Sequence, residues 1–122
     1  MKYRKFKRNN RDISILGFGG WQLGNTEFWG EMTYDYGVKL VQESIKRGVV
    51  FFDTAPGYSN GLSEKIIGEG VKEYRDKVFI NTKFGHKADG TSDFSVSSIE
   101  ESIDSSCERL QTDYLDSIII HK

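Results

Sequence analysis

"VVFFDTAPGY" occupies residues 49–58 and contains the clearest structural signal in this 122-residue chain. Its first four residues are apolar without alternation, which is typical of a strand covered on both faces in a parallel sheet. The run ends at Asp53, and a Pro56-Gly57 turn separates it from Tyr58. A buried strand that ends in a carboxylate predicts a polar site at the carboxyl edge of such a sheet.

Extended and helical patterns alternate on both sides of this stretch. Helical spacing is found from Thr33 to Gly48, from Leu62 to Arg75 and after a Ser95 cap, and the strands "ILGFGG", "VVFFDT", "KVFINTK" and "YLDSIII" lie between and around these segments. Four strands joined by three helices predict an α/β fold with a parallel sheet. The alternation alone allows an open doubly wound sheet or a barrel. The sequence contains neither GxGxxG after the first strand nor GxxxxGK[ST], so no phosphate-binding glycine motif favours the doubly wound form.

Residues 1–15 precede this pattern and predict a β-hairpin around an Asn-Asn turn. We expect its apolar side chains Tyr3, Phe6, Ile13 and Ile15 to point inward, and we interpret its Lys and Arg side chains as solvated. Residues 21–32 read as a loop. The expected organisation is one domain, residues 1–122, with the hairpin at 1–15 and the strands and helices at 16–122.

The composition is that of an ordinary globular protein, with 37% hydrophobic and 29% charged residues. A net charge of −1 argues against a nucleic-acid or acidic-membrane partner. The sequence shows neither an apolar stretch of transmembrane length nor the apolar core of a secretory signal. Cys107 has no second cysteine to pair with, so we expect it to serve packing, and we expect a cytoplasmic location.

Three predicted strands stop at residues able to do chemistry, namely Asp53, Lys83 and His121. Neighbouring strands lie about 5 Å apart, so we expect Asp53 and Lys83 to form an ion pair. The Pro56-Gly57 turn places Tyr58 near that pair, where a cation favours the phenolate and makes the phenol a usable proton donor. His121 is then positioned to hydrogen-bond a substrate oxygen.

This group suits the reduction of a carbonyl compound, in which a tyrosine supplies the proton and a cofactor supplies the hydride. A purely structural interpretation is equally compatible with the spacing. In it, Asp53 caps the next helix, Lys83 pairs with Asp53, and His121 is a satisfied histidine at a strand end.

At these residues the sequence resembles the aldo-keto reductase family of (β/α)₈ barrels. The resemblance covers essentially the whole chain and rests on four runs in order: "LGFGGWQLG" at residues 16–24, "FFDTAPGYSNGLSEKIIGEGV" at 51–71, "NTKFG" at 81–85 and "ERLQTDYLDSIIIHK" at 108–122.

The resemblance implies NADPH-dependent reduction of aldehydes or ketones, or the reverse oxidation. Its catalytic residues would be Asp53, Tyr58, Lys83 and His121, with Tyr58 as the acid. Gly20, Trp21 and Asp53 would contact the cofactor, NADPH or NADP⁺, and Trp21, Trp29, Tyr58 and His121 would line the pocket for a small carbonyl substrate. No metal is implied.

Other matching residues are interpreted as structural. They are the helix-start residues Leu62, Ser63, Glu64 and Gly68, and the two acids Asp113 and Asp116. His86 has no matching role and is expected to be exposed.

The resemblance also implies that this chain corresponds to the N-terminal half of the (β/α)₈ barrel, an incomplete TIM barrel whose floor the hairpin closes. Further cofactor contacts would belong to the other half. Open strand edges predict association of the chain with itself.

Two functions therefore stay open: a reductase within a completed barrel, and a non-catalytic half-barrel that binds itself or a partner. A Schiff-base aldolase or isomerase using Lys83 is disfavoured, because a lysine paired with Asp53 stays protonated.

Overall fold

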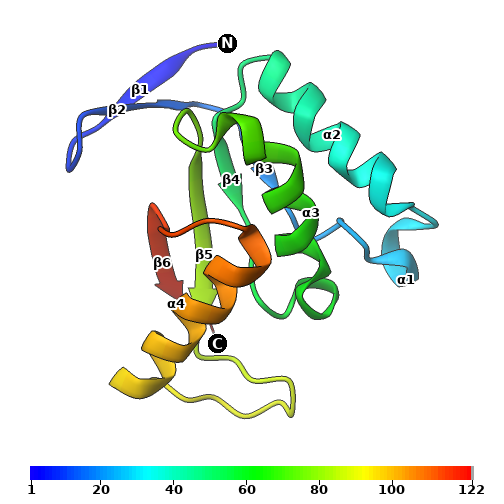
Figure 1. The fold of residues 1–122 in the computed structure, drawn as a ribbon, viewed down its shortest axis with the longest axis vertical. Helices are drawn as coiled ribbons and strands as arrows, with labels where there is room; N and C mark the ends of the chain where they lie inside the picture. The colour runs from blue at the N-terminus through cyan, green and yellow to red at the C-terminus, as the bar shows by residue number, and fades with distance from the viewer. Residues whose placement is uncertain (122) are drawn as a thin grey trace.

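Two sheets form the framework of the computed structural model, which describes residues 1–121. The hairpin consists of β1 (Tyr3–Phe6) and β2 (Arg11–Ser14), paired antiparallel. The second sheet is parallel, in the order β3-β4-β5-β6, and its strands are β3 (Gly17–Gly19), β4 (Phe51–Asp53), β5 (Phe79–Phe84) and β6 (Ser117–Ile120). Figure 1 shows the hairpin at the end where β5 and β6 begin.

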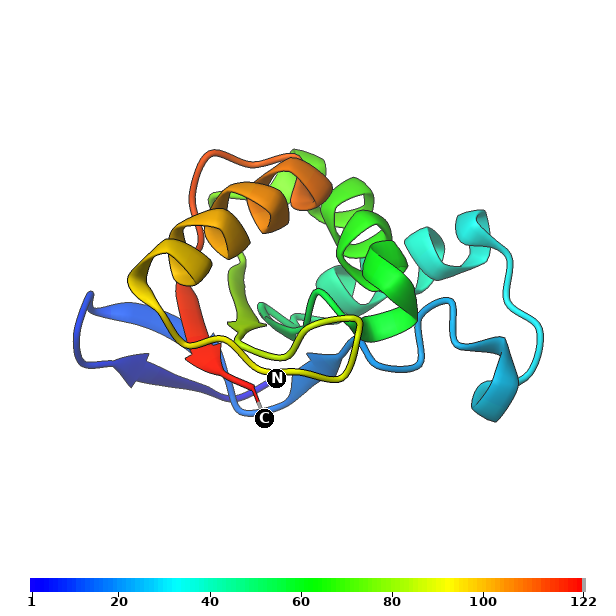
Figure 2. The ribbon, with the colours of Figure 1, turned by 90° about the horizontal axis from the view of Figure 1, so that it is seen from below.

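Three long helices connect these strands, as predicted: α2 (Tyr34–Lys46), α3 (Leu62–Val71) and α4 (Val96–Leu110). Hydroxyl side chains cap two of them, because Thr33 accepts from Tyr36 N–H and Ser95 accepts from Ser98 N–H. Figure 2 shows the three helices in an arc outside the strands. A parallel sheet with helices on its outer face and a hairpin before it is the N-terminal half of a TIM barrel, which confirms the predicted fold class.

Two segments differ from the sequence expectation. The stretch 21–32, predicted as a loop, contains the one-turn helix α1 (Thr26–Trp29), which Asn25 caps. The helix predicted to run to Arg75 ends at Val71 and continues as the 3₁₀ turn η2 (Lys72–Tyr74). A further 3₁₀ segment, η1 (Tyr58–Gly61), leads into α3.

The two faces of the parallel sheet differ in character because strand side chains alternate. Phe52, Ile80 and Thr82 point toward the helices, where Phe52 and Ile80 join a core with residues of α2, α3 and α4. We call the opposite side the inner face, and it contains Phe51, Asp53, Phe79, Asn81, Lys83, Ser117 and Ile119. Polar residues gather on the inner face at the ends of the strands.

The hairpin covers the other end of the inner face. Phe6 packs edge-on against Phe79 with ring centroids 5.2 Å apart, and Arg11 binds Asp116 and the carbonyl of Val78. The expectation that the hairpin's apolar side chains point inward is wrong for Tyr3 and Ile15, which are 46% and 52% exposed, whereas Phe6 meets the sheet and Ile13 is half-buried. The hairpin crosses the sheet at one end and meets it through few side chains.

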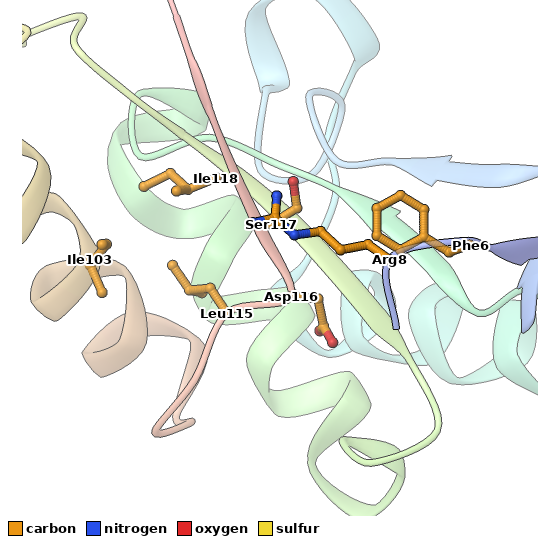
Figure 3. Close-up of a pocket in the computed structure, with 7 residues that line it drawn as sticks. All are labelled: Phe6, Arg8, Ile103, Leu115, Asp116, Ser117 and Ile118. Atoms are coloured by element: carbon orange, nitrogen blue, oxygen red, sulfur yellow. The ribbon is translucent and has the colours of Figure 1, made fainter. Parts of the chain in front are cut away.

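A cavity of about 400 Å³ lies between the hairpin, α4 and the start of β6. Figure 3 shows its lining residues: Phe6, Arg8, Ile103, Leu115, Asp116, Ser117 and Ile118. Ser117 and Ile118 of this lining stand at the beginning of β6, whereas His121 follows its end. This cavity is therefore remote from the polar strand ends.

Candidate active site

Asp53 and Lys83 form the predicted ion pair on the inner face. Lys83 Nζ donates to Asp53 Oδ2 at 2.8 Å and to the carbonyl of Thr54 at 2.8 Å. In the sheet register Asp53 lies opposite Asn81, so Lys83 stands two residues further along β5 and its side chain reaches back to the carboxylate. The lysine side chain is nearly buried at 10% exposure, whereas Asp53 keeps 35% of its side chain open.

Asn81 is a site residue that the sequence interpretation missed. Its side-chain N–H donates to Asp53 Oδ1 at 2.7 Å, so each carboxylate oxygen has its own donor. The signal was present in "NTK", because residues two apart on a strand share a face and Asn81 must accompany Lys83. Asn81 fixes the orientation of the carboxylate that Lys83 binds.

Tyr58 lies over this ion pair. Its N–H donates to the carbonyl of Ala55 at 3.1 Å, which closes the turn through Pro56 and Gly57. Lys83 Nζ lies 4.9 Å from the centre of the Tyr58 ring, and the phenol is half-buried. The turn therefore places the predicted acid beside the predicted cation.

His121 faces Tyr58 from the next strand. Its ring is perpendicular to that of Tyr58 with centroids 5.9 Å apart, and its backbone N–H donates to the carbonyl of Phe84 at 2.8 Å. Burial lowers the pKa of His121, the positive charge of Lys83 and the neighbouring His86 lower it further, and Asp53 opposes them. The neutral imidazole is thus favoured at the site.

His86 is exposed, as expected, but it is not remote from the site. Its ring lies 6.0 Å from that of His121. The sequence interpretation assigned it no role, since it lies beyond the end of β5 in a loop whose path the sequence does not reveal.

The structure places Gly20 and Trp21 after β3, at the same edge of the sheet. Gly20 is buried, and both of its backbone polar groups are engaged within the chain: its N–H donates to the carbonyl of Asp53, and its carbonyl accepts from Ser63. Trp21 is 45% exposed and packs against Trp29 with centroids 5.8 Å apart. Among residues 1–121, no aromatic contact joins this tryptophan pair to Tyr58 or His121.

The structural interpretation of Asp53 as a helix cap is wrong. The residue before α3 is Gly61, in a left-handed conformation and without a side-chain cap. Glu64 and Asp116, by contrast, are structural as expected. Glu64 is fully buried between Thr82 and Arg109, and Asp116 binds Arg11, Arg75 and the N–H of Ile80.

Two further findings describe the part of the chain that the structure covers. Residues 1–121 contain no group of three or more His, Cys, Asp or Glu side chains arranged to bind a metal ion. None of their helices combines the length and the apolar character that a membrane crossing requires.

Comparison with known proteins shows which family the chain is similar to. The family model described as the aldo/keto reductase family matches residues 15–122. L-galactose dehydrogenase of Arabidopsis thaliana is 40% identical over 112 residues, which cover 89% of this chain and 34% of the plant protein.

Solved structures give the same result. The holo form of the aldo-keto reductase AKR11C1 from Bacillus halodurans is 30% identical, with a TM-score of 0.86, over 99% of this chain and 40% of its own. An aldo/keto reductase from Klebsiella pneumoniae, solved in complex with NADP and acetate, is 26% identical with a TM-score of 0.73, over 93% of this chain and 37% of its own. The chain thus spans about a third of the length of the curated relatives it matches, such as the 34% for the plant dehydrogenase.

Proposed function

Because this chain belongs to the aldo/keto reductase family, we propose that it carries the catalytic residues for NADPH-dependent reduction of aldehydes or ketones, or for the reverse oxidation. The observation that supports this most directly is the placement of Lys83, whose ammonium lies 2.8 Å from Asp53 and 4.9 Å from the centre of the Tyr58 ring. A phenol, a cation and a paired carboxylate at one strand edge form the proton-donating side of a carbonyl reductase.

Each residue has a distinct task in this proposal. Tyr58 donates its phenolic proton to the carbonyl oxygen as negative charge develops there. Lys83 stabilises the phenolate that remains, and Asp53 orients Lys83 through their ion pair. His121, whose pKa is lowered, acts as a neutral imidazole that hydrogen-bonds the carbonyl oxygen and directs it toward Tyr58.

The residues present suit the nicotinamide end of the cofactor. Gly19 has open space where a side chain would be, Trp21 is partly exposed, and the Asp53 side chain is 35% open. Gly20 would contribute close approach only, because its polar groups are already bonded. The bound NADPH supplies the hydride that the residues of this site do not supply. Trp21 and Trp29 would contact the substrate.

The first test is the reduction of a generic aldehyde by the purified chain with NADPH, followed by loss of cofactor absorbance. Replacing Tyr58→Phe is expected to lower the rate at least about 100-fold, the usual effect of losing a positioned general acid. Tyr36→Phe is the matched control, because Tyr36 is 56% exposed on α2. Equal loss in both variants, or none in Tyr58→Phe, would contradict the proposal.

A second candidate function rests on a different observation. The edge strand β6 exposes Ile119 by 45% and Ile120 by 65%. Exposed apolar side chains on an edge strand favour association with a second polypeptide. The alternative is therefore a half-barrel without catalytic activity of its own that binds another copy of itself or a partner chain.

A further inference from the structure

A cavity of about 310 Å³ opens beside the candidate active site and has no role in the mechanism above. One wall is formed by Pro56 and Gly57, which immediately precede Tyr58, and by Asn60. The other wall is the start of the loop between β5 and α4, through His86, Lys87 and Ala88. The cavity thus adjoins the site through two of its lining residues, since Gly57 directly precedes Tyr58 and the His86 ring lies 6.0 Å from that of His121.

The polar groups that line this cavity favour a negatively charged ligand. Asn60, His86 and Lys87 contribute an amide, an imidazole and an ammonium group, all able to donate hydrogen bonds, and no carboxylate lines it. Within residues 1–121, the Asn60 and His86 side chains make no hydrogen bonds to the protein. Lys87 has only a loose ion pair, because Asp93 is 4.0 Å away and about half exposed.

The loop that carries His86 and Lys87 is held in place by its own backbone. His86 forms an isolated antiparallel bridge with Ser92, and the N–H of Lys87 donates to the carbonyl of Thr91 at 2.9 Å. Asp89 binds Thr91 and Asp93 binds the N–H of Ser95, so both carboxylates are engaged within the loop. The two basic side chains are thus presented at the cavity by an ordered turn.

We propose that Asn60, His86 and Lys87 form a subsite for a carboxylate group of the substrate, so that the reaction acts on oxo acids in preference to neutral carbonyl compounds. The subsite borders the candidate active site, because the ring centroids of His86 and His121 are 6.0 Å apart. The neighbouring Lys83 adds positive potential, although Asp53 neutralises part of it. Identifying the ligand as a carbonyl compound rests on the proposed function, whereas binding of its carboxylate does not.

The experiment compares two ligands that differ in one group: levulinate and 2-pentanone, in which a methyl group replaces the carboxylate. Binding to the purified 122-residue chain is measured by NMR from shifts of the histidine ring signals, without cofactor and without turnover. We expect levulinate to bind about tenfold more tightly than 2-pentanone, as one charge-assisted hydrogen bond would provide. His86→Gln and Lys87→Gln should each reduce this preference to about twofold or less.

Lys39→Gln is the matched control, because it removes a positive charge from the exposed side of α2 and should leave the preference unchanged. Equal binding of both ligands, no binding of levulinate, or a preference that survives both loop substitutions would overturn the subsite. A measurement of levulinate reduction with NADPH distinguishes failure of the reductase assignment from failure of the subsite. Selective binding without reduction refutes only the reductase assignment, and reduction without selectivity refutes only the subsite.

Discussion

At the scale of single residues, the backbone after Tyr58 is unusual. Ser59 (φ 49°, ψ 40°) and Asn60 (φ 53°, ψ 45°) are both left-handed, and Gly61 follows at φ 87°. Left-handed residues other than glycine carry a strain of about 1 kcal/mol or more and tend to occur at functional sites. Here the Ser59 hydroxyl donates to the carbonyl of Leu23 at 2.8 Å. The turn thereby connects Tyr58 to the loop that follows Trp21.

This strain leads to a prediction for Asn60. Asn60→Ala should lower the free energy of unfolding by about 1 kcal/mol, because alanine tolerates the left-handed region less well than asparagine. Asn60→Gly should stay within about 0.5 kcal/mol of the wild type, since glycine adopts this conformation without strain. Urea unfolding measures both values. If the alanine variant is as stable as the glycine variant, the turn is not strained in solution.

The lowered pKa of His121 predicts a pH dependence of stability. Burial and the nearby positive groups disfavour the imidazolium in the folded chain relative to the unfolded chain, whose reference pKa is 6.5. The unfolded state therefore binds the proton first. The contribution of His121 to stability is complete above pH 6.5 and is lost as the pH falls toward the folded-state pKa.

Comparing the wild type with His121→Gln isolates this contribution from those of other groups. Urea unfolding at several values between pH 7.5 and pH 5 should show the wild type losing stability relative to the variant as the pH falls. Parallel profiles would mean that the folded chain does not disfavour the protonated imidazole.

At the scale of elements, α3 holds the site-bearing strands and the outer helices together. A Cβ on Gly68 would lie 2.5 Å from the carbonyl oxygen of Leu110, so the backbones of α3 and α4 are in contact there. On the same helix, Glu64 binds Thr82 on β5 at 2.7 Å and Arg109 on α4 at 2.5 Å. The helix that follows the Tyr58 turn is therefore fixed to the strand that carries Lys83.

Gly68→Ala should destabilise the fold by about 2 kcal/mol, because an inserted methyl group in a closely packed contact must displace backbone. Gly57→Ala is the control. It lies at φ −77°, and a Cβ there has no atom within 4 Å, so it should change stability by less than about 0.5 kcal/mol. Thermal or urea unfolding compares the two. Similar values would show that α3 and α4 can separate at little cost.

At the scale of the whole molecule, half of a barrel exposes what a complete barrel covers. Ile119 lies on the inner face of the edge strand β6, and 45% of it is exposed. The net charge of −1 produces little electrostatic repulsion between two copies of the chain. Each Å² of apolar surface buried on association contributes roughly 25 cal/mol before the entropic costs. We therefore expect the isolated chain to self-associate through this region.

Sedimentation equilibrium tests this expectation. The wild type should show a mass above that of the 13.9 kDa chain at micromolar concentration, and Ile119→Lys should shift the distribution toward the monomer. Val96→Lys provides the control, because Val96 is 75% exposed at the start of α4, away from the sheet edge. A monomeric wild type, or equal effects of both lysines, would contradict association through β6.

The alternation of strands and helices, the parallel direction of the strands and the polar residues at their ends followed from the sequence alone. Apolar runs ending at Asp53, Lys83 and His121 indicate buried strands with polar carboxyl ends, because parallel neighbours bring those ends to one edge. The Asp53–Lys83 pair was predictable for the same reason.

Only the tertiary structure showed how loops and side chains meet at that edge. His86 stands beside His121, and the cavity next to Tyr58 forms between two loops, although nothing in their local sequence encodes their separation. The exposure of Tyr3 and Ile15 likewise depends on how the hairpin meets the sheet. Periodicity reports local backbone geometry, whereas contacts between loops depend on where rigid strands and helices place their ends.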